Sequence, residues 1–337
     1  MRSVKTIAAA MAVAGVLAAG VARAEPLTIH VGWVTLAASS VPLSLDKKDL
    51  LKHYGQSYVI DPISMKSTAA MITALATGDV SIGTLAYSSL AFAIENAKIN
   101  DIRIITGVNE DGVGDYATTN YMVLKDGPIK KIEDLKGKVV ASLTTGSAVD
   151  IGLRAMLRKH GMDDKKDVTF VEAQFPNMRP LLMEHKADLV SMILPFKDDP
   201  AIKENARTLF TQKDAMGKAQ LLVWAGRKGF LEANRAAVTD FIEDSVRFTR
   251  YITDPKNHAE AVAMVAKGLK QPIEQVDYLY TERDLYKDPK QLPDLEALQA
   301  NIDLEHELGF IPHSITVKDY ADLSFVEEAD KRLAKEK

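Results

Sequence analysis

The chain has 337 residues, 47% of them apolar and 26% charged, which is typical of a soluble globular protein with one large or two medium-sized domains. It contains no cysteine, which excludes disulfides, thiolate nucleophiles, cysteine-ligated metal sites and a lipid-anchored N-terminal cysteine. The net charge is −4 and both signs are interspersed along the chain, which argues against a nucleic-acid partner.

Residues 1–24 have the pattern of a cleavable secretory signal. Arg2 and Lys5 precede the apolar run Ile7–Val21, and an A-x-A site follows at 22–24. We expect cleavage after this site, export to a periplasm and a net charge of −7, because the segment holds three bases and no acids. A retained membrane anchor is the alternative, which the short apolar run disfavours.

The residues that follow alternate between strand and helix patterns. We expect strands at Leu27–Val34, Tyr58–Met65, Val80–Gly83 and Ile102–Val108, with helices at Leu45–Tyr54, Ala69–Thr77 and 84–97 between them. Repeated β-α-β units predict an α/β fold with a mainly parallel sheet and helices on both faces.

The same pattern restarts near residue 121. We expect strands at Tyr121–Leu124, Lys138–Ser142, Val168–Glu172, Asp188–Ile193 and Leu221–Ala225, with helices at 147–161 and Asn177–Lys186. Beyond residue 235 the chain is predicted to be helical, at Ala236–Ile252, His258–Lys267, Pro272–Arg283 and Leu295–Leu308. No flexible linker separates the two halves, which predicts a discontinuous first lobe, residues 25–118 plus 222–337, and a second lobe, residues 119–221.

Three corners between a strand and the next helix carry hydroxyl side chains: Lys66-Ser67-Thr68, Tyr87-Ser88-Ser89 and Thr144-Thr145-Gly146-Ser147. Ligands of open α/β sheets bind beyond the carboxyl ends of strands, and helix N-termini favour anions there. A helix cap is the alternative at each corner. Three corners in corresponding positions favour a ligand cleft over three separate caps. The aromatic residues Trp33, Tyr87 and Phe196 lie near strand ends and are further candidates to contact the ligand.

Signatures of catalysis are missing from the sequence. There is no G-x-S-x-G elbow, no phosphate-binding P-loop and no dinucleotide-binding glycine motif, and the seven histidines lack the spacing of a metal site. We therefore expect no catalytic residue, metal or cofactor. The acidic cluster Glu110, Asp111 and Asp115 is interpreted as a solvated turn, with contact to a ligand amine as the alternative.

Three segments in order carry a family resemblance. "ALATGDVSIGTLAYSSLAFA", "GPIKKIEDLKGKVVASLTTGS" and "FPNMRPLLMEHKADLVSMILPF" resemble segments of solute-binding proteins of ABC importers, in the nitrate, aliphatic sulfonate and taurine group. Lys186 stands where that group often has glycine, and the likeness covers roughly residues 27–230. The resemblance implies a two-lobed, hinged protein whose ligand-contacting corners are Ser67, Thr68, Tyr87, Ser88, Thr145, Gly146 and Ser147, with Trp33 added by the first-strand loop.

The resemblance also implies a periplasmic protein that delivers its ligand to a membrane permease. We expect this protein to be monomeric. We expect a small organic anion, of the sulfonate or aromatic carboxylate type, held by Lys66 and the corner Thr144–Ser147. In that corner the N–H of Ser147 and the hydroxyls of Thr145 and Ser147 would donate hydrogen bonds. A neutral or cationic heterocycle of the pyrimidine or thiamine-precursor type is the alternative. A related thiamine-precursor synthase needs a cysteine-rich motif, which disfavours that enzyme here.

Overall fold

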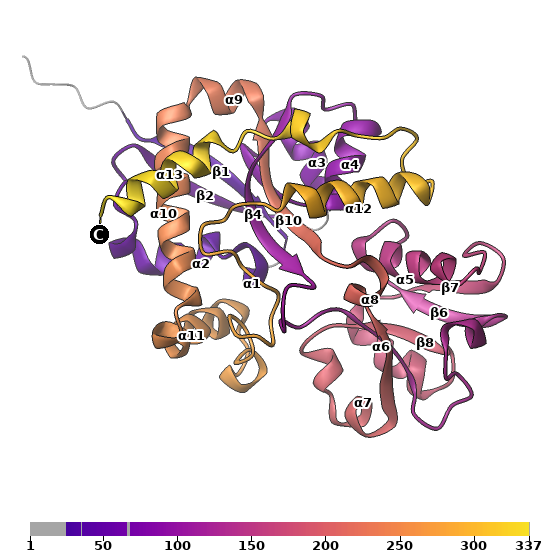
Figure 1. The fold of residues 1–337 in the computed structure, drawn as a ribbon. Helices are drawn as coiled ribbons and strands as arrows, with labels where there is room; N and C mark the ends of the chain where they lie inside the picture. The colour runs from indigo at the N-terminus through magenta and orange to yellow at the C-terminus, as the bar shows by residue number, and fades with distance from the viewer. Residues whose placement is uncertain (1–24, 35, 66–67, 337) are drawn as a thin grey trace, which may run out of the picture.

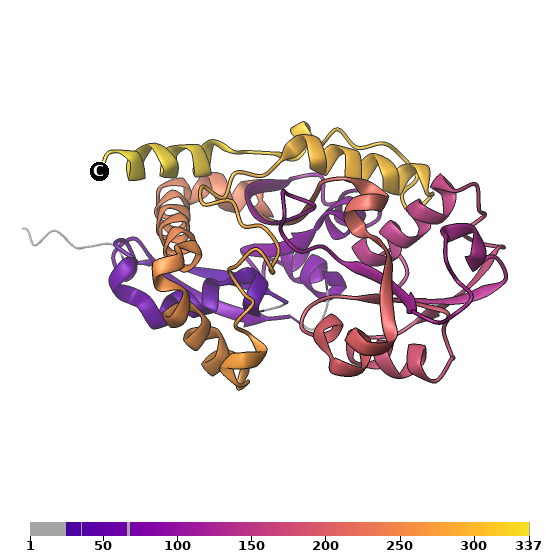
Figure 2. The ribbon, with the colours of Figure 1, turned by 60° about the horizontal axis from the view of Figure 1, so that its bottom comes forward.

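The computed structural model describes residues 25–34, 36–65 and 68–336, so the predicted signal segment lies outside the described residues. The described chain forms two five-stranded sheets, each flanked by helices, in two units that lie side by side (Figures 1 and 2). This arrangement confirms the predicted two-lobed α/β fold. The assignment of residues 25–118 plus 222–337 to one lobe and 119–221 to the other stays a prediction.

The first sheet has the strand order β2-β1-β3-β10-β4. Its strands are β1 (Leu27–Trp33), β2 (Tyr58–Ser64), β3 (Ile82–Ala86), β4 (Ile102–Asp111) and β10 (Ala219–Arg227). β1 pairs in parallel with β2 and β3, whereas β10 is antiparallel to β3 and β4. The sheet is therefore mixed, with one reversed strand that returns from the second unit.

The second sheet repeats this plan in the order β7-β6-β8-β5-β9. Its strands are β5 (Asn120–Leu124), β6 (Lys138–Ser142), β7 (Val168–Glu172), β8 (Leu189–Met192) and β9 (Ala206–Thr211). β6 is parallel to β7 and β8, and β5 is antiparallel to β8 and β9. The reversed strand is again the one that enters from the other unit.

Helices cover both faces of the first sheet (Figure 1). α3 (Thr68–Thr77), α4 (Tyr87–Glu95) and α12 (Leu295–Glu307) share one apolar cluster with the sheet. α10 (Arg235–Thr253) and α13 (Ser324–Ala334) share another, in which Trp224 stacks on Phe241 at 5.4 Å between ring centroids. The remaining helices of this unit are α1 (Leu36–Ser39), α2 (Val41–Ser44), α9 (Lys228–Ala233) and α11 (His258–Leu269).

The second unit contains α5 (Ala148–Lys159), α6 (Phe175–Met183), α7 (Pro200–Asn205), α8 (Gln212–Met216) and the short 3-10 helix η3 (Phe196–Asp198). None of the helices in the described part of the chain is both long and apolar enough to span a membrane. The other 3-10 helices are η1 (Leu45–Leu50), η2 (Ile132–Leu135), η4 (Pro255–Asn257), η5 (Ile273–Gln275) and η6 (Val317–Tyr320).

Two of the predicted helices are wrong. Segment 272–283 contains only η5 and then turns, because side chains satisfy its backbone locally: Thr281 donates to the carbonyl of Tyr278, and the N–H of Tyr280 donates to Asp284. Segment 45–54 contains only η1, which is interrupted at Lys47, and the N–H groups of residues 52 and 53 donate to the carboxylate of Asp244 instead of continuing a helix. The other predicted strands and helices overlap elements of the structure.

Residues 278–287, which we name the strap, run beside the junction of the two units. The strap is tied to the end of β4 by paired backbone hydrogen bonds between Glu110 and Tyr286 at 2.9 and 3.1 Å. Its Tyr278 hydroxyl donates to the carbonyl of Leu194 in the second unit at 3.4 Å. The strap thus contacts both units at their junction.

Candidate ligand-binding cleft

A cavity of about 240 Å³, which we name the main cavity, lies between the two sheets at the carboxyl ends of their strands. Its walls come from the end of β4, the crossing residues 117–119, the loops after β6 and β8, the first residue of α8 and the strap. The lining residues are Ala38, Asn109, Asp111, Ala117, Thr118, Thr119, Leu143, Ala148, Val149, Phe175, Ile193, Leu194, Lys197, Gln212, Leu221, Tyr278, Leu279, Arg283, Asp284, Leu285 and Lys287. Apolar side chains with a few charged groups are the usual composition of a small-molecule site.

Lys197 is a cation of the main cavity that forms no ion pair within the described residues. It belongs to η3, which follows β8 after a connection at residues 193–195, and its Nζ donates a hydrogen bond to Oδ1 of Asn120 at 3.0 Å. Burial lowers the pKa of Lys197, and the nearby charges of Asp198 and Asp111 oppose that shift. A partly desolvated ammonium paired only with a neutral amide favours an anion that completes its charge pairing.

Asp111 places a buried carboxylate on the same cavity. It is the last residue of β4, is 1% exposed, and accepts a hydrogen bond from the N–H of Thr119 at 3.3 Å, while its Oδ1 has no partner. Burial raises the pKa of Asp111 to about 6, although backbone hydrogen bonds and nearby lysines lower it. The main cavity is therefore lined by a hydrogen-bond acceptor, the Asp111 carboxylate, as well as by the Lys197 ammonium.

The strap adds two further cations, and both are already paired. The buried Nζ of Lys287 donates to Oδ1 of Asn109 at 3.1 Å and lies 3.7 Å from the carboxylate of Asp284. Arg283 pairs with Asp198 of η3, so it joins the strap to the second unit.

A second cavity of about 380 Å³ lies between the N-terminal ends of α4 and α5 and the end of α12. Its described lining residues are Ile72, Ala86, Ser88, Ser89, Phe92, Thr144, Thr145, Gly146, Ser147, Ala148, Glu305, Phe310 and Ile311. Four residues of the sequence-predicted site, Ser88 and the run 145–147, meet here. They come from the two different units.

Backbone N–H groups of the corner 144–147 are used by the protein itself. The N–H of Thr145 donates to Glu172 at 2.7 Å, that of Gly146 to Asp150 at 3.0 Å, and that of Ser147 to the carbonyl of Thr144 at 2.9 Å. Ser147 also caps α5, because its Oγ accepts from the N–H of Asp150 at 3.3 Å. Two carboxylates thus occupy the anion-binding groups of this helix start, and a ligand role of the corner stays a prediction.

Tyr87 and Ala148 form a hydrogen bond across the junction of the two units. The buried Tyr87 hydroxyl donates to the carbonyl of Ala148 at 3.2 Å, and Ala148 lines both cavities. Gln212 Nε2 donates to the same carbonyl at 3.0 Å, and Tyr121 donates to the carbonyl of Val149 at 2.7 Å. A Cβ at Gly152 would stand 2.3 Å from the Gln212 amide, so only glycine fits this packing of α5.

Trp33 and Phe196 are not among the described residues that line the two cavities. Trp33 is half-buried and packs against the cluster around α11. Phe196 stacks on Phe175 at 6.0 Å in a groove beside the main cavity. Lys66 and Ser67 lie outside the described residues, and Thr68 begins α3.

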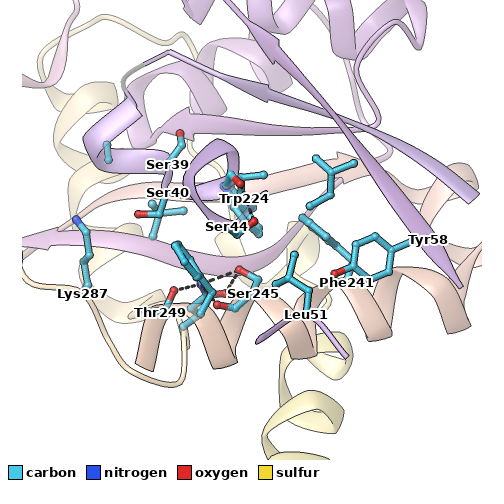
Figure 3. A pocket seen from close by; sticks show the side chains of 16 residues that line it. Ser39, Ser40, Ser44, Leu51, Tyr58, Trp224, Phe241, Ser245, Thr249 and Lys287 are labelled. Carbon is cyan, nitrogen blue, oxygen red and sulfur yellow. Dashed lines mark hydrogen bonds between the residues drawn. The ribbon is translucent and has the colours of Figure 1, made fainter. Parts of the chain in front are cut away.

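Two other features of the first unit resemble binding sites, and we propose no ligand for either. The pocket of Figure 3, between Ser39, Ser44, Trp224 and Phe241, has a volume of about 20 Å³, room for one water molecule. The donor atoms of His53, Asp240 and Glu243 lie within 4.8 Å of one another, as in a metal site. Arg247 pairs with Glu243 at 2.7 Å and Arg332 with Asp240 at 2.8 Å, so ion pairs account for this cluster.

Solved structures share this fold. The aliphatic sulphonate-binding protein SsuA of Escherichia coli has a TM-score of 0.68 and 18% identity, over 88% of this chain and 92% of that one. The nitrate-binding protein NrtA of Synechocystis PCC 6803 has a TM-score of 0.67 and 13% identity, over 92% and 89%. The desulfurization enzyme DszB has a TM-score of 0.63 and 14% identity, over 91% and 99%. Both binding proteins are described as periplasmic.

Sequence comparison gives the family. No curated protein matches the chain. The sequence model of the family described as NMT1/THI5 like matches residues 60–267, which include strands of both sheets and most of the residues that line the two cavities. Since this match covers more than half of the chain, the protein belongs to the NMT1/THI5-like family.

Proposed function

We propose that this protein is the periplasmic solute-binding component of an ABC importer. It captures a small organic anion in the main cavity by closure of its two lobes and delivers it to a membrane permease. The fold shared with SsuA and NrtA supports this role. The signal-like residues 1–24 support export, and the absence of cysteine supports a protein without a lipid anchor.

The position of Lys197 is the observation that most directly supports an anionic ligand. Its ammonium lines the main cavity, is partly desolvated, and has an amide oxygen as its hydrogen-bond partner. An anionic oxygen at this ammonium would supply a charge-assisted hydrogen bond, which is stronger than one between neutral groups. Lys197 thereby takes the role that the sequence analysis gave to Lys66.

The walls of the cavity favour an organic anion over an inorganic one. Leu143, Ile193, Leu194, Leu221 and Leu285 surround a volume of about 240 Å³, so the ligand's body would bury apolar surface against them. We propose a sulfonate or carboxylate attached to an aliphatic or aromatic body. The Asp111 carboxylate repels a second negative charge and thus orients the anionic end towards Lys197.

Contacts across the junction support a hinged binding mechanism. Tyr87 contacts Ala148, Arg283 contacts Asp198, and Arg158 donates to the carbonyls of residues 307 and 308 at 3.0 and 3.2 Å. A ligand that touches both lobes would favour this closed arrangement by its greater affinity for it. We keep the lobe boundaries at residues 118/119 and 221/222 as part of this proposal. The second boundary falls inside β10, which pairs with β4 of the first sheet from Ala219 onward.

A neutral or cationic heterocycle is the second candidate, and Asp111 is the observation that favours it. Its unpartnered Oδ1 could accept a hydrogen bond from a ring N–H or an exocyclic amine. We propose a binding role rather than an enzymatic one, because the described residues that line the main cavity include no serine or histidine that a general base could activate as a nucleophile.

Ligand-induced stabilisation distinguishes these candidates. We would screen sulfonates, aromatic carboxylates and pyrimidines by thermal shift, where a ligand at a hundredfold excess over its Kd stabilises the fold by about 2.7 kcal/mol. An anion hit should lose affinity in Lys197→Met and keep it in Lys186→Met, a matched control whose side chain is 65% exposed. Preference for uncharged analogues, with unchanged affinity in Lys197→Met, would support the heterocycle instead.

A further inference from the structure

The second cavity contains a buried carboxyl group without a partner. Glu305 of α12 is 1% exposed, and its Oε1 has no hydrogen-bond partner. No ion pair joins Glu305 to a basic side chain anywhere in the described residues, and none of the described residues that line this cavity is basic. Buried polar groups are almost always paired, so an unpaired carboxyl that faces a cavity is a candidate ligand contact.

The other walls of this cavity suit the apolar body of a cation. Phe310 lines it, and Phe92, which is 48% exposed, lies at its side on α4. Aromatic faces attract ammonium and guanidinium groups. The N–H groups of Thr145 and Gly146 already bind carboxylates, so this part of the wall has no free backbone donor for an anion.

We propose that the second cavity binds a small organic cation, an ammonium or amidinium on a compact apolar body, which pairs with Glu305 and packs against Phe310 and Phe92. The cavity volume of about 380 Å³ accommodates a molecule of that size. This site differs from the one proposed for the anion, because Ala148 is the only described residue that lines both cavities.

The charge of Glu305 makes this binding depend on pH. Burial raises the pKa of Glu305 to about 8, so the free carboxyl is neutral at pH 7. Tyr87 of α4 faces it, and the Glu305 charge adds to the rise of the Tyr87 pKa. On α5, Arg154 lies 5.7 Å from the Phe310 ring but pairs with Asp150 and Asp164, and Arg158 pairs with Asp164. A cation binds the ionised carboxyl and therefore displaces its proton.

Benzamidine is a suitable probe, because its amidinium stays charged between pH 6 and pH 9. We would titrate it into the purified protein by calorimetry at pH 6, 7, 8 and 9, in buffers of different ionisation enthalpy. If only the ionised Glu305 binds, affinity rises by up to about a hundredfold from pH 6 to pH 9 and levels off above pH 8. Proton release accompanies binding below pH 8.

Variants test the assignment to Glu305. Glu305→Gln should abolish the pH dependence and the proton release, while Glu307→Gln, which changes an exposed acid on the same helix, should leave both unchanged. Phe310→Leu, which keeps apolar contact without a ring, should weaken binding at every pH and provides a second test if Glu305→Gln does not fold. Absence of benzamidine binding at pH 9, or an identical profile in Glu305→Gln, would overturn the proposal.

Discussion

The hydroxyl of Tyr87 and the carbonyl oxygen of Ala148 form a hydrogen bond of 3.2 Å between the first turn of α4 and the first residue of α5. These helices belong to different sheet units, and the Tyr87 side chain is fully buried between them. The bond therefore lies where the units meet and where the two cavities approach each other. If the two units close on a ligand as we propose, this bond would link that closure to the shape of the cavities.

Tyr87→Phe should weaken ligand binding without unfolding the protein. The substitution keeps the ring and removes one hydrogen bond, which contributes about 1 kcal/mol, or about fivefold in Kd if the bond forms only on closure. Calorimetric titration of the ligand found by the screen, with scattering to follow closure, measures this effect. An unchanged Kd with a lowered Tm would show that the bond supports the fold alone.

Anion affinity should change with pH in two steps. The pKa of Lys197 is lowered by burial, so its charge is lost as pH rises towards that lowered value, below the ordinary 10.5, and anion affinity falls. The pKa of Asp111 is raised to about 6, so below pH 6 the carboxyl becomes neutral and anion affinity rises. For charges several ångströms apart, each step is on the order of tenfold.

Two variants separate these steps in titrations from pH 5 to pH 10. Asp111→Asn should remove the step near pH 6 and keep the alkaline one, and Lys197→Met should do the reverse. A flat profile in the unsubstituted protein would argue against an anionic ligand in this cavity.

Ser147→Ala distinguishes capping from ligand binding at the corner that the sequence analysis singled out. Because Oγ of Ser147 accepts the N–H of Asp150, its loss should cost about 1 kcal/mol of unfolding free energy. Capping alone predicts an unchanged Kd. A Kd weaker by one to two decades would instead assign a ligand hydrogen bond to Ser147, as the sequence analysis expected.

Glu305→Gln should change how stability depends on pH. The folded pKa of Glu305 is raised to about 8, so from pH 4.5 to pH 8 the unfolded chain is ionised there and the folded protein is not. This carboxyl therefore destabilises the fold progressively as pH rises through that window, by about 1.4 kcal/mol per unit. Relative to the unsubstituted protein, Glu305→Gln should gain stability over the same window.

Urea unfolding at pH 5, 6, 7 and 8 measures this difference. Glu307→Gln is the matched control, since its exposed side chain should give a constant difference across the series. A constant difference for Glu305→Gln as well would show that the Glu305 carboxyl is not desolvated in solution.

The regular spacing of apolar residues made most of the fold predictable from the sequence. Strands such as β4 and helices such as α10 present continuous or periodic apolar residues to a core, and both sheets followed from the repeated β-α-β pattern. β9 was not predicted, because Arg207 and Thr208 interrupt its apolar residues at the edge of the sheet. α13 was missed for a different reason, since its apolar face is short and follows an irregular segment.

The candidate site was less predictable from the sequence, because it is built from segments in which apolar residues do not recur at regular spacing. The corner at 144–147 lines a cavity, and its role as a ligand site stays a prediction. The sequence could not show that Glu172 and Asp150 occupy its N–H groups. Lys197 lies in the short 3-10 helix η3, and nothing in the sequence around it distinguishes it from an exposed lysine, although the fold half-buries its side chain. The strap was predicted to be partly helical, so the cavity contacts of Arg283 and Lys287 were missed.

A crystal structure of the protein with the tightest anion from the screen tests the central claim most directly. We predict electron density for the ligand in the main cavity, with an anionic oxygen at about 3 Å from Nζ of Lys197 and the body against Leu194 and Leu221. A ligand bound outside this cavity, or inside it with its anionic group away from Lys197, would contradict the account.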